Sequence, residues 1–169
     1  MISKKTGEMV NEQVGHELAA FIQYVALSAY FESEALPELA GYFAKQAEEE
    51  KSHALKFVKY LNDDDHAGGV PAIPQPACAF KCVEEAIRLA YDQEVRVTNQ
   101  IEAIYNQAAS ESDRITQNFL QWFLTEQLEE VAGMDTLLKI VRRAGDDLFR
   151  VEDYIAREGH PEDASGAAA

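Results

Sequence analysis

The stretch QAEEEKSHALKF, residues 46–57, decides the fold. It places Glu50 and His53 three residues apart, so both side chains project from the same face of a helix. Glu17 precedes this pair by 33 and 36 residues and lies on an apolar helical stripe of its own. Acidic and imidazole side chains that face the core of a helical bundle are typical of a metal site.

The same spacing occurs a second time in the C-terminal half of the chain. Glu94 precedes Gln127 and Glu130 by 33 and 36 residues, and each of the three interrupts an apolar stripe. If the two pairs of helices turn near residues 36 and 111, all the polar side chains of both halves lie near mid-length. Folding would therefore collect them in one layer inside a bundle.

The apolar periodicity predicts an all-α protein, a four-helix bundle with a short fifth helix at the C-terminal end. The expected helices cover about residues 7–34, 38–62, 81–109, 112–143 and 147–157. The long segment between the second and third helices contains Gly68-Gly69 and three prolines, and it is long enough to span the bundle. The second and third helices can therefore be parallel or antiparallel.

The C-terminal region contains a short amphipathic segment and a polar tail. Leu148, Val151 and Ile155 recur at helical spacing, but so short a helix needs a packing partner. We expect these three residues to pack against symmetry mates. Residues 1–158 are predicted to form a single domain, and residues 159–169, small and polar, a disordered tail.

Composition excludes several classes of protein. A net charge of −15 over 169 residues argues against a nucleic-acid partner and favours attraction of cations. No apolar run is long enough for a membrane span, and the first residues lack the pattern of a signal peptide, so we expect a cytoplasmic protein. Cys78 and Cys82 are predicted to be free thiols.

The chemistry of the six polar residues favours iron or manganese, because carboxylate oxygens and an imidazole nitrogen are hard ligands. Buried carboxylates need cations or raised pKa values, and two divalent ions would neutralise the four glutamates. Glu50 is the natural bridge between the two ions, with Glu17 and His53 completing one position. Glu94 and Glu130 would complete the other. That leaves Gln127, which we interpret as a weak ligand or as a hydrogen-bond partner of the ligands.

Other residues near these positions have two interpretations. Tyr24 lies two helical turns after Glu17 and could donate an electron or a hydrogen bond to dioxygen, or it could be a core tyrosine. Glu49, Glu126 and Glu129 lie beside the predicted ligands, where like charges repel unless cations bind. From the residues alone, an ordinary solvated surface is the preferred explanation of these three glutamates.

The whole pattern resembles the non-haem bacterial ferritins over nearly the full chain. The resemblance rests on Glu17, Glu50-x-x-His53, Glu94 and Gln127-x-x-Glu130, together with Tyr24, the stretch NFLQW at 118–122, the long crossover and the fifth helix. It implies a hollow shell of twenty-four copies that oxidises Fe(II) with dioxygen and stores Fe(III) oxide. It also implies a fifth helix that lines a symmetry axis, and a third iron site at Glu49, Glu126, Glu129 and Glu130.

Two departures from related families refine this interpretation. Haem-binding relatives carry a methionine directly after the bridging glutamate, whereas this chain has Lys51, so we expect no haem. Those relatives also repeat Glu-x-x-His on the fourth helix, whereas this chain has Gln127 and Glu130, which favours a centre through which iron passes. A di-iron peroxidase or oxidase of the rubrerythrin type and a purely structural bundle are the alternatives.

Overall fold

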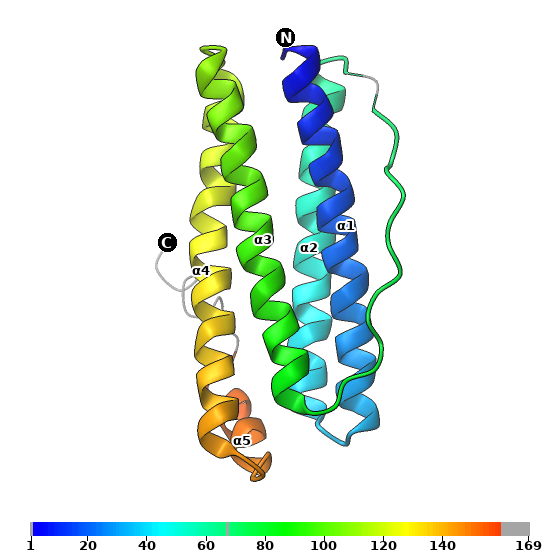
Figure 1. Ribbon diagram of the computed structural model, residues 1–169, viewed down its shortest axis with the longest axis vertical. Helices are drawn as coiled ribbons and strands as arrows, with labels where there is room; N and C mark the ends of the chain where they lie inside the picture. Colours follow the sequence, from blue (N-terminus) through cyan, green and yellow to red (C-terminus); the bar gives the residue numbers. More distant parts are fainter. Residues whose placement is uncertain (1, 67, 160–169) are drawn as a thin grey trace.

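A computed structural model of the chain describes residues 2–66 and 68–159, and the regular structure in these ranges is entirely helical. Its helices are α1 (Lys4–Ser33), α2 (Pro37–Asp63), α3 (Val83–Ser110), α4 (Arg114–Ala144) and α5 (Phe149–Glu158). The first four lie side by side as a bundle, and α5 crosses one end of it (Figure 1). The predicted disordered tail falls on residues 160–169, outside the described residues, apart from Gly159.

The connections define the topology of the bundle. Short turns join α1 to α2 and α3 to α4, so each pair is antiparallel. Residues 64–66 and 68–82 run along the whole length of the bundle, beside α1, and bring the chain back to the end where α2 begins (Figure 1). α2 and α3 are therefore parallel, and the expected fold with one long crossover is confirmed.

Capping side chains explain where two of the helices begin. The Ser3 hydroxyl accepts a hydrogen bond from the Thr6 amide at 3.1 Å, so α1 starts three residues earlier than the periodicity predicts. The Asp113 carboxylate accepts from the Thr116 amide at 3.0 Å, which starts α4 at Arg114 and not at residue 112. Apolar periodicity is insensitive to such caps, because a capping residue is polar and lies outside the stripe.

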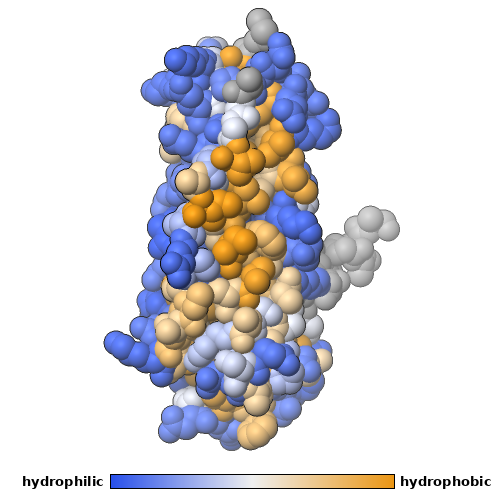
Figure 2. Space-filling model, turned by 90° about the vertical axis from the view of Figure 1, so that its right-hand side faces the viewer, coloured by the Kyte–Doolittle hydropathy of each residue, from blue (hydrophilic) through white to orange (hydrophobic). Residues whose placement is uncertain are grey.

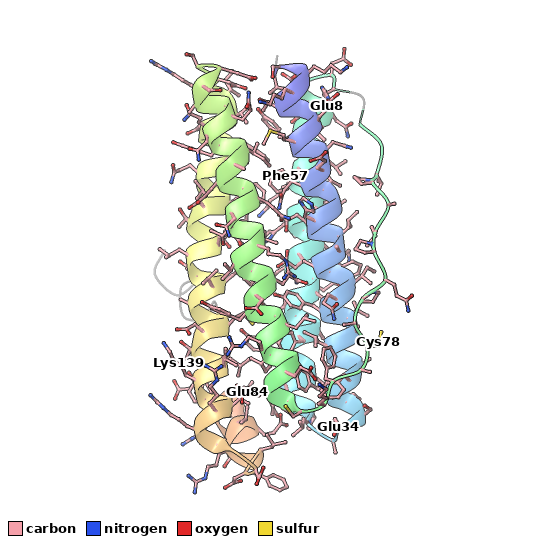
Figure 3. The ribbon with its side chains drawn as sticks, in the orientation of Figure 1. Glu8, Glu34, Phe57, Cys78, Glu84 and Lys139 are labelled. Carbon is pink, nitrogen blue, oxygen red and sulfur yellow. The ribbon has the colours of Figure 1, made fainter. Side chains whose placement is uncertain are left out.

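The core consists of two apolar clusters separated by a polar layer. One cluster lies at the end of the bundle near α5 and includes Leu27, Phe43 and Met134. The other lies toward the opposite end and includes Phe57, which points between the helices (Figure 3). Each of the four long helices contributes to both clusters, so the predicted polar residues occupy the layer between them.

α2 and α4 face each other through aromatic rings. Phe57 stacks on Phe123 with 4.2 Å between ring centroids, and Tyr60 stacks on Phe119 at 4.1 Å. Large aromatic rings thus fill the space between these two helices.

α5 folds back on its own bundle, so the expected packing of Leu148, Val151 and Ile155 against symmetry mates is wrong. Val151 and Ile155 are buried in the apolar cluster at that end, and Leu148 packs against the same cluster. The Glu152 carboxylate accepts hydrogen bonds from the backbone amides of Glu38 at 2.8 Å and Leu39 at 3.0 Å. It thereby caps α2, which has no side-chain cap of its own.

Two expectations about the rest of the chain can be compared with the structure. Cys78 and Cys82 are exposed free cysteines, as predicted, and Cys78 lies on the crossover (Figure 3). Within residues 2–66 and 68–159, no helix is both long enough and apolar enough to cross a membrane.

Candidate metal centre

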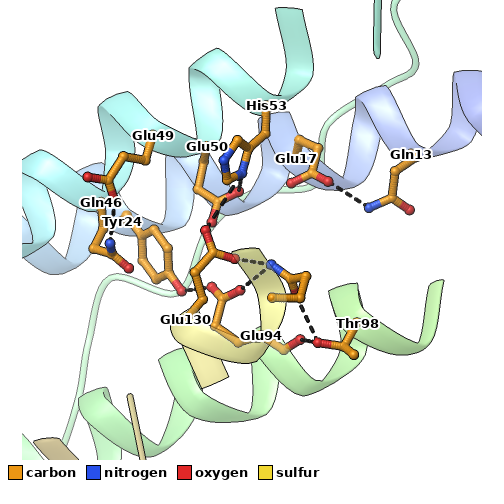
Figure 4. A network of polar contacts seen from close by, with 11 residues as sticks. Gln13, Glu17, Tyr24, Gln46, Glu49, Glu50, His53, Glu94, Thr98 and Glu130 are labelled. Carbon is orange, nitrogen blue, oxygen red and sulfur yellow. Dashed lines mark hydrogen bonds and ion pairs between the residues drawn. The ribbon is translucent and has the colours of Figure 1, made fainter. Parts of the chain in front are cut away.

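The four long helices bring the six predicted polar side chains together at the middle of the bundle (Figure 4). All of them are buried, with exposed fractions of 0% for Glu17, 1% for Glu50, 4% for His53, 0% for Glu94, 1% for Gln127 and 4% for Glu130. So much acid in an apolar core is unstable unless protons, hydrogen bonds or cations compensate it. The geometry shows which of these each half of the site uses.

The first group of potential ligands comes from α1 and α2. Glu17, Glu50 and His53 each offer one ligand atom, and the three atoms lie within 4.8 Å of one another. One buried carboxylate oxygen on Glu17 and one on Glu50 have no hydrogen-bond partner in the protein. Unpartnered, buried carboxylate oxygens beside an imidazole fit a divalent cation of the iron type.

The second group shares a member with the first. Glu50, Glu94 and Glu130 also offer three ligand atoms within 4.8 Å of one another. His53 Nδ1 lies 3.6 Å from Glu50 Oε2 and 3.7 Å from Glu130 Oε1, so the two groups are contiguous. Because Glu50 belongs to both groups, it lies where a bridging carboxylate would have to be.

Gln127 is oriented by its neighbours. Its Nε2 donates hydrogen bonds to Glu130 and, at 3.4 Å, to Glu94, while its Oε1 accepts from the Thr98 hydroxyl at 2.9 Å. The amide therefore presents N–H groups to the carboxylates and turns its oxygen away from them. Of the two interpretations of Gln127, this orientation fits the hydrogen-bond partner better than the ligand.

Tyr24 lies at the edge of the same layer and is fully buried. Its hydroxyl donates a hydrogen bond to Glu94 (Figure 4). Burial, followed by the nearby carboxylate of Glu94, raises the pKa of Tyr24 well above 10, so the phenol keeps its proton.

Burial also changes the protonation of the potential ligands. It raises the pKa of Glu17 and, reinforced by the other carboxylates, raises that of Glu50 well above its ordinary value. Burial raises the pKa of Glu94 to about 7 and lowers that of His53 to about 4. At neutral pH the metal-free centre therefore holds protons on carboxylates and a neutral imidazole, and a cation would displace those protons.

The three glutamates predicted for a third site are more exposed. Glu49 and Glu126 are half-buried and Glu129 is exposed, and none of the three belongs to either of the two ligand groups found in the described ranges. Gln46 donates a hydrogen bond to Glu49 (Figure 4). Their role as iron ligands stays a prediction, beside the interpretation that they form a solvated surface.

Two residues of the site were missed by sequence reasoning. Gln13 donates a hydrogen bond from Nε2 to Glu17 Oε1 at 2.9 Å, and Thr98 orients Gln127 as described above. Each lies four residues from a glutamate ligand candidate on the same helix, Gln13 before Glu17 and Thr98 after Glu94. That i, i+4 relation is the signal that could have identified them.

Comparison with known proteins gives consistent results. A family profile described as a ferritin-like domain matches residues 7–144. Ferritin BfrB of Mycolicibacterium smegmatis is 41% identical over 157 residues, covering 93% of this chain and 87% of that protein. A bacterial non-heme ferritin of Staphylococcus aureus (strain MRSA252) is 35% identical, covering 87% and 89%. An open pore ferritin from the archaeon Archaeoglobus fulgidus superposes with a TM-score of 0.88 at 28% identity, covering 91% and 95%. These matches confirm the resemblance drawn from the sequence, and the chain belongs to the ferritin family.

Proposed function

We propose that this chain is an iron-storage protein that oxidises Fe(II) with dioxygen at the buried centre and deposits Fe(III) oxide in a hollow shell. Membership of the ferritin family supports iron storage. The observation that carries the oxidation step is the pair of ligand groups that share Glu50, with unpartnered oxygens on Glu17 and Glu50. A purely structural bundle would have no use for unsatisfied acids in its core.

In this proposal iron is the substrate, and the protein holds two ions at once. Glu17 and His53 bind one, Glu94 and Glu130 bind the other, and Glu50 bridges them. Binding two Fe(II) ions side by side gives dioxygen two electron donors within reach of one molecule. The protons released from the buried carboxylates leave as the ions enter, so binding strengthens as pH rises.

Tyr24 is proposed to act on the dioxygen side of the reaction. In the metal-free centre its hydroxyl donates a hydrogen bond to Glu94. When Glu94 binds a cation, that carboxylate becomes a poorer acceptor, and the buried phenol can donate its hydrogen bond to dioxygen instead. It can also donate an electron to dioxygen if its proton passes to a neighbouring carboxylate at the same time.

Iron is proposed to pass through the centre and not to stay there. Gln127 offers N–H groups where the glutamate of a second Glu-x-x-His would offer a ligand oxygen, which weakens retention at that position. Glu49, Glu126 and Glu129, together with Glu130, are proposed to hold a third ion on its way to the mineral.

Assembly into a shell of twenty-four copies is part of the same proposal, and family membership supports homo-oligomeric assembly. The side of the bundle that carries α1 and the crossover shows a broad apolar band in Figure 2. Val25 on α1 and Val70 on the crossover are exposed apolar residues, with exposed fractions of 46% and 68%. Such a band is the kind of surface that a second copy would cover.

Aerobic addition of Fe(II) to metal-free protein tests the proposal. We expect a rapid rise in near-ultraviolet absorbance for the first two ions per chain, followed by slower growth of mineral. Analytical ultracentrifugation and electron microscopy would show a hollow particle that fills with iron. Oxidation no faster than in buffer alone would contradict the enzymatic part, and a monomer in solution would contradict the storage shell.

A further inference from the structure

Lys56 and Trp122 form a stacked pair at the α2–α4 edge of the centre. The Lys56 ammonium lies 3.1 Å from the centroid of the Trp122 ring. Trp122 is the only tryptophan of the chain, and 40% of its surface is exposed. The ring also meets His53 edge to face, with 5.5 Å between centroids. A positive charge is thus linked by two ring contacts to a proposed metal ligand.

The helical positions explain why the pair lies at this place. Lys56 is three residues after His53 on α2, and Trp122 is four residues before Glu126 on α4, so each is one turn from an acidic or ligand position. The carboxylates of Glu126 and Glu130 raise the pKa of Lys56, although burial lowers it by more. After burial, Lys56 is the next cause that lowers the pKa of His53. The charge of the Lys56 ammonium therefore acts on His53 of α2 and on the two glutamates of α4.

We propose that the Lys56 ammonium, held on the Trp122 ring, is a built-in counter-cation that competes with divalent metal ions at the α2–α4 side of the centre. It compensates Glu126 and Glu130 while metal is absent. A metal ion that binds on this side repels it, and the ammonium leaves the ring. The inference rests on the proposed metal centre and adds a residue that sets how tightly an ion is held where iron would leave for the mineral.

The alternative is that Lys56 only covers the indole with its hydrocarbon stem. The two explanations differ in what the charge does, because stem packing survives loss of the ammonium whereas competition does not. Lys56→Met keeps the length and the apolar stem and removes the charge. Lys56→Arg keeps the charge and the ability to stack. Lys59→Met is the matched control, since Lys59 is exposed on the same helix and pairs with Asp63 at 2.7 Å.

Zn(II), which has no redox chemistry, is the probe. Titration of metal-free assembled protein by calorimetry should show that the ion held next to Glu126 and Glu130 is bound roughly three- to tenfold more tightly in Lys56→Met. Lys56→Arg and Lys59→Met should stay within about twofold of the unaltered protein. The difference should shrink at about 0.5 M salt, because screening weakens the charge effect. Trp122 emission should change on Zn(II) binding in the unaltered protein and change much less in Lys56→Met.

Equal Zn(II) affinity of Lys56→Met and the unaltered protein at low salt would overturn the inference, and so would Lys56→Arg behaving like Lys56→Met. Either result leaves the proposed metal centre intact. If Zn(II) failed to bind even the unaltered protein, the centre and the inference would both be wrong. If Zn(II) bound as expected but Fe(II) were not oxidised, only the proposed oxidation would be wrong.

Discussion

The half of the centre on α1 and α2 and the half on α3 and α4 share one helical spacing but satisfy their buried carboxylates differently. In the first half, one oxygen of Glu17 and one of Glu50 have no hydrogen-bond partner in the protein. In the second half, Tyr24 and Gln127 donate to Glu94, and Gln127 also donates to Glu130. Gln13 donates to the other oxygen of Glu17, so the first half is compensated only in part and keeps free oxygens for a cation, whereas both carboxylates of the second half receive hydrogen bonds from the protein.

This difference predicts an order of binding. An unpartnered buried carboxylate oxygen costs free energy until something positive reaches it, so a cation gains most in the α1–α2 half. In the α3–α4 half a cation must first compete with hydrogen bonds from the phenol and the amide. We therefore expect the first divalent ion to bind at Glu17, Glu50 and His53, and the second to bind more weakly.

The largest effect is expected for Glu50, because it is the one residue that both halves share. Glu50→Ala should lower the rate of Fe(II) oxidation by about 100-fold or more, since it removes a ligand from both ions at once. Stopped-flow absorbance measures the rate, and circular dichroism checks that the helices remain folded. Glu48→Ala is the matched control, because Glu48 is exposed on the same helix and pairs with Lys51 at 2.7 Å. Rapid oxidation by the Glu50 variant would show that Glu50 is not a ligand shared by the two halves, and the comparison between the halves would then be wrong.

A pair of isosteric substitutions tests the order of binding directly. Glu17→Gln should weaken binding of the first Zn(II) ion by at least about tenfold, because it removes a charged ligand with an unpartnered oxygen from the half where that ion binds. Glu94→Gln should leave the first ion within about threefold of its normal affinity and weaken the second. Calorimetric titration of metal-free protein separates the two steps. Equal losses of the first ion in both variants would show that the halves are not distinct.

The contrast between the halves was only partly visible in the sequence. Buried ligand candidates such as Glu17 could be predicted, because an acid on an apolar stripe conflicts with the pattern around it. Thr98 and Lys56 were missed, because polar residues at the edge of a helix fit the ordinary amphipathic pattern, and the i, i+4 spacing of Thr98 from Glu94 does not reveal the partner of its hydroxyl. Their roles depend on a partner from another helix, Gln127 in one case and Trp122 in the other.

The docking of α5 on its own bundle also could not be predicted from the sequence. The periodicity of Val151 and Ile155 indicated that the fifth helix needs a partner, but not that the partner is its own bundle. That choice depends on Glu152 reaching the uncapped start of α2, across more than 100 positions of the chain. The direction of the crossover was open for a similar reason, since its length allows both arrangements of α2 and α3.

The pH dependence of stability should show how much the buried acids cost in the absence of metal. The pKa of Glu94 is about 7 in the folded protein against an ordinary 4.5, so the folded state retains a proton that the unfolded state has lost. The free energy of unfolding therefore falls as pH rises through this interval, and Glu17 and Glu50 act in the same direction.

His53 acts in the opposite direction, but only at lower pH. Its pKa of about 4 lies below the ordinary 6.5, so its contribution to stability is complete above 6.5 and is lost as pH falls toward 4. Between pH 6.5 and about 8 the glutamates alone should set the slope, and the melting temperature of metal-free protein should decrease. Saturating Zn(II) should reduce this decrease, and Glu94→Gln should reduce it in part. A melting temperature that rises over this range without metal would contradict the assignment.

The smallest expected effect concerns Thr98, which acts on the α3–α4 half through Gln127. Thr98→Val keeps the shape of the side chain but removes the hydroxyl that holds Gln127 Oε1 at 2.9 Å. The amide is then free to rotate, its N–H groups compete less for Glu94 and Glu130, and its oxygen can turn toward the centre. The second Zn(II) ion should therefore bind roughly two- to fivefold more tightly, with the first ion unchanged.

Thr125→Val on α4 controls for the substitution itself. The Thr125 hydroxyl is exposed and donates a hydrogen bond to the backbone oxygen of Gln121 at 3.1 Å, away from the centre. Weaker binding of the second ion, or an equal change in the first, would mean that the hydrogen bonds of this half do not oppose the cation.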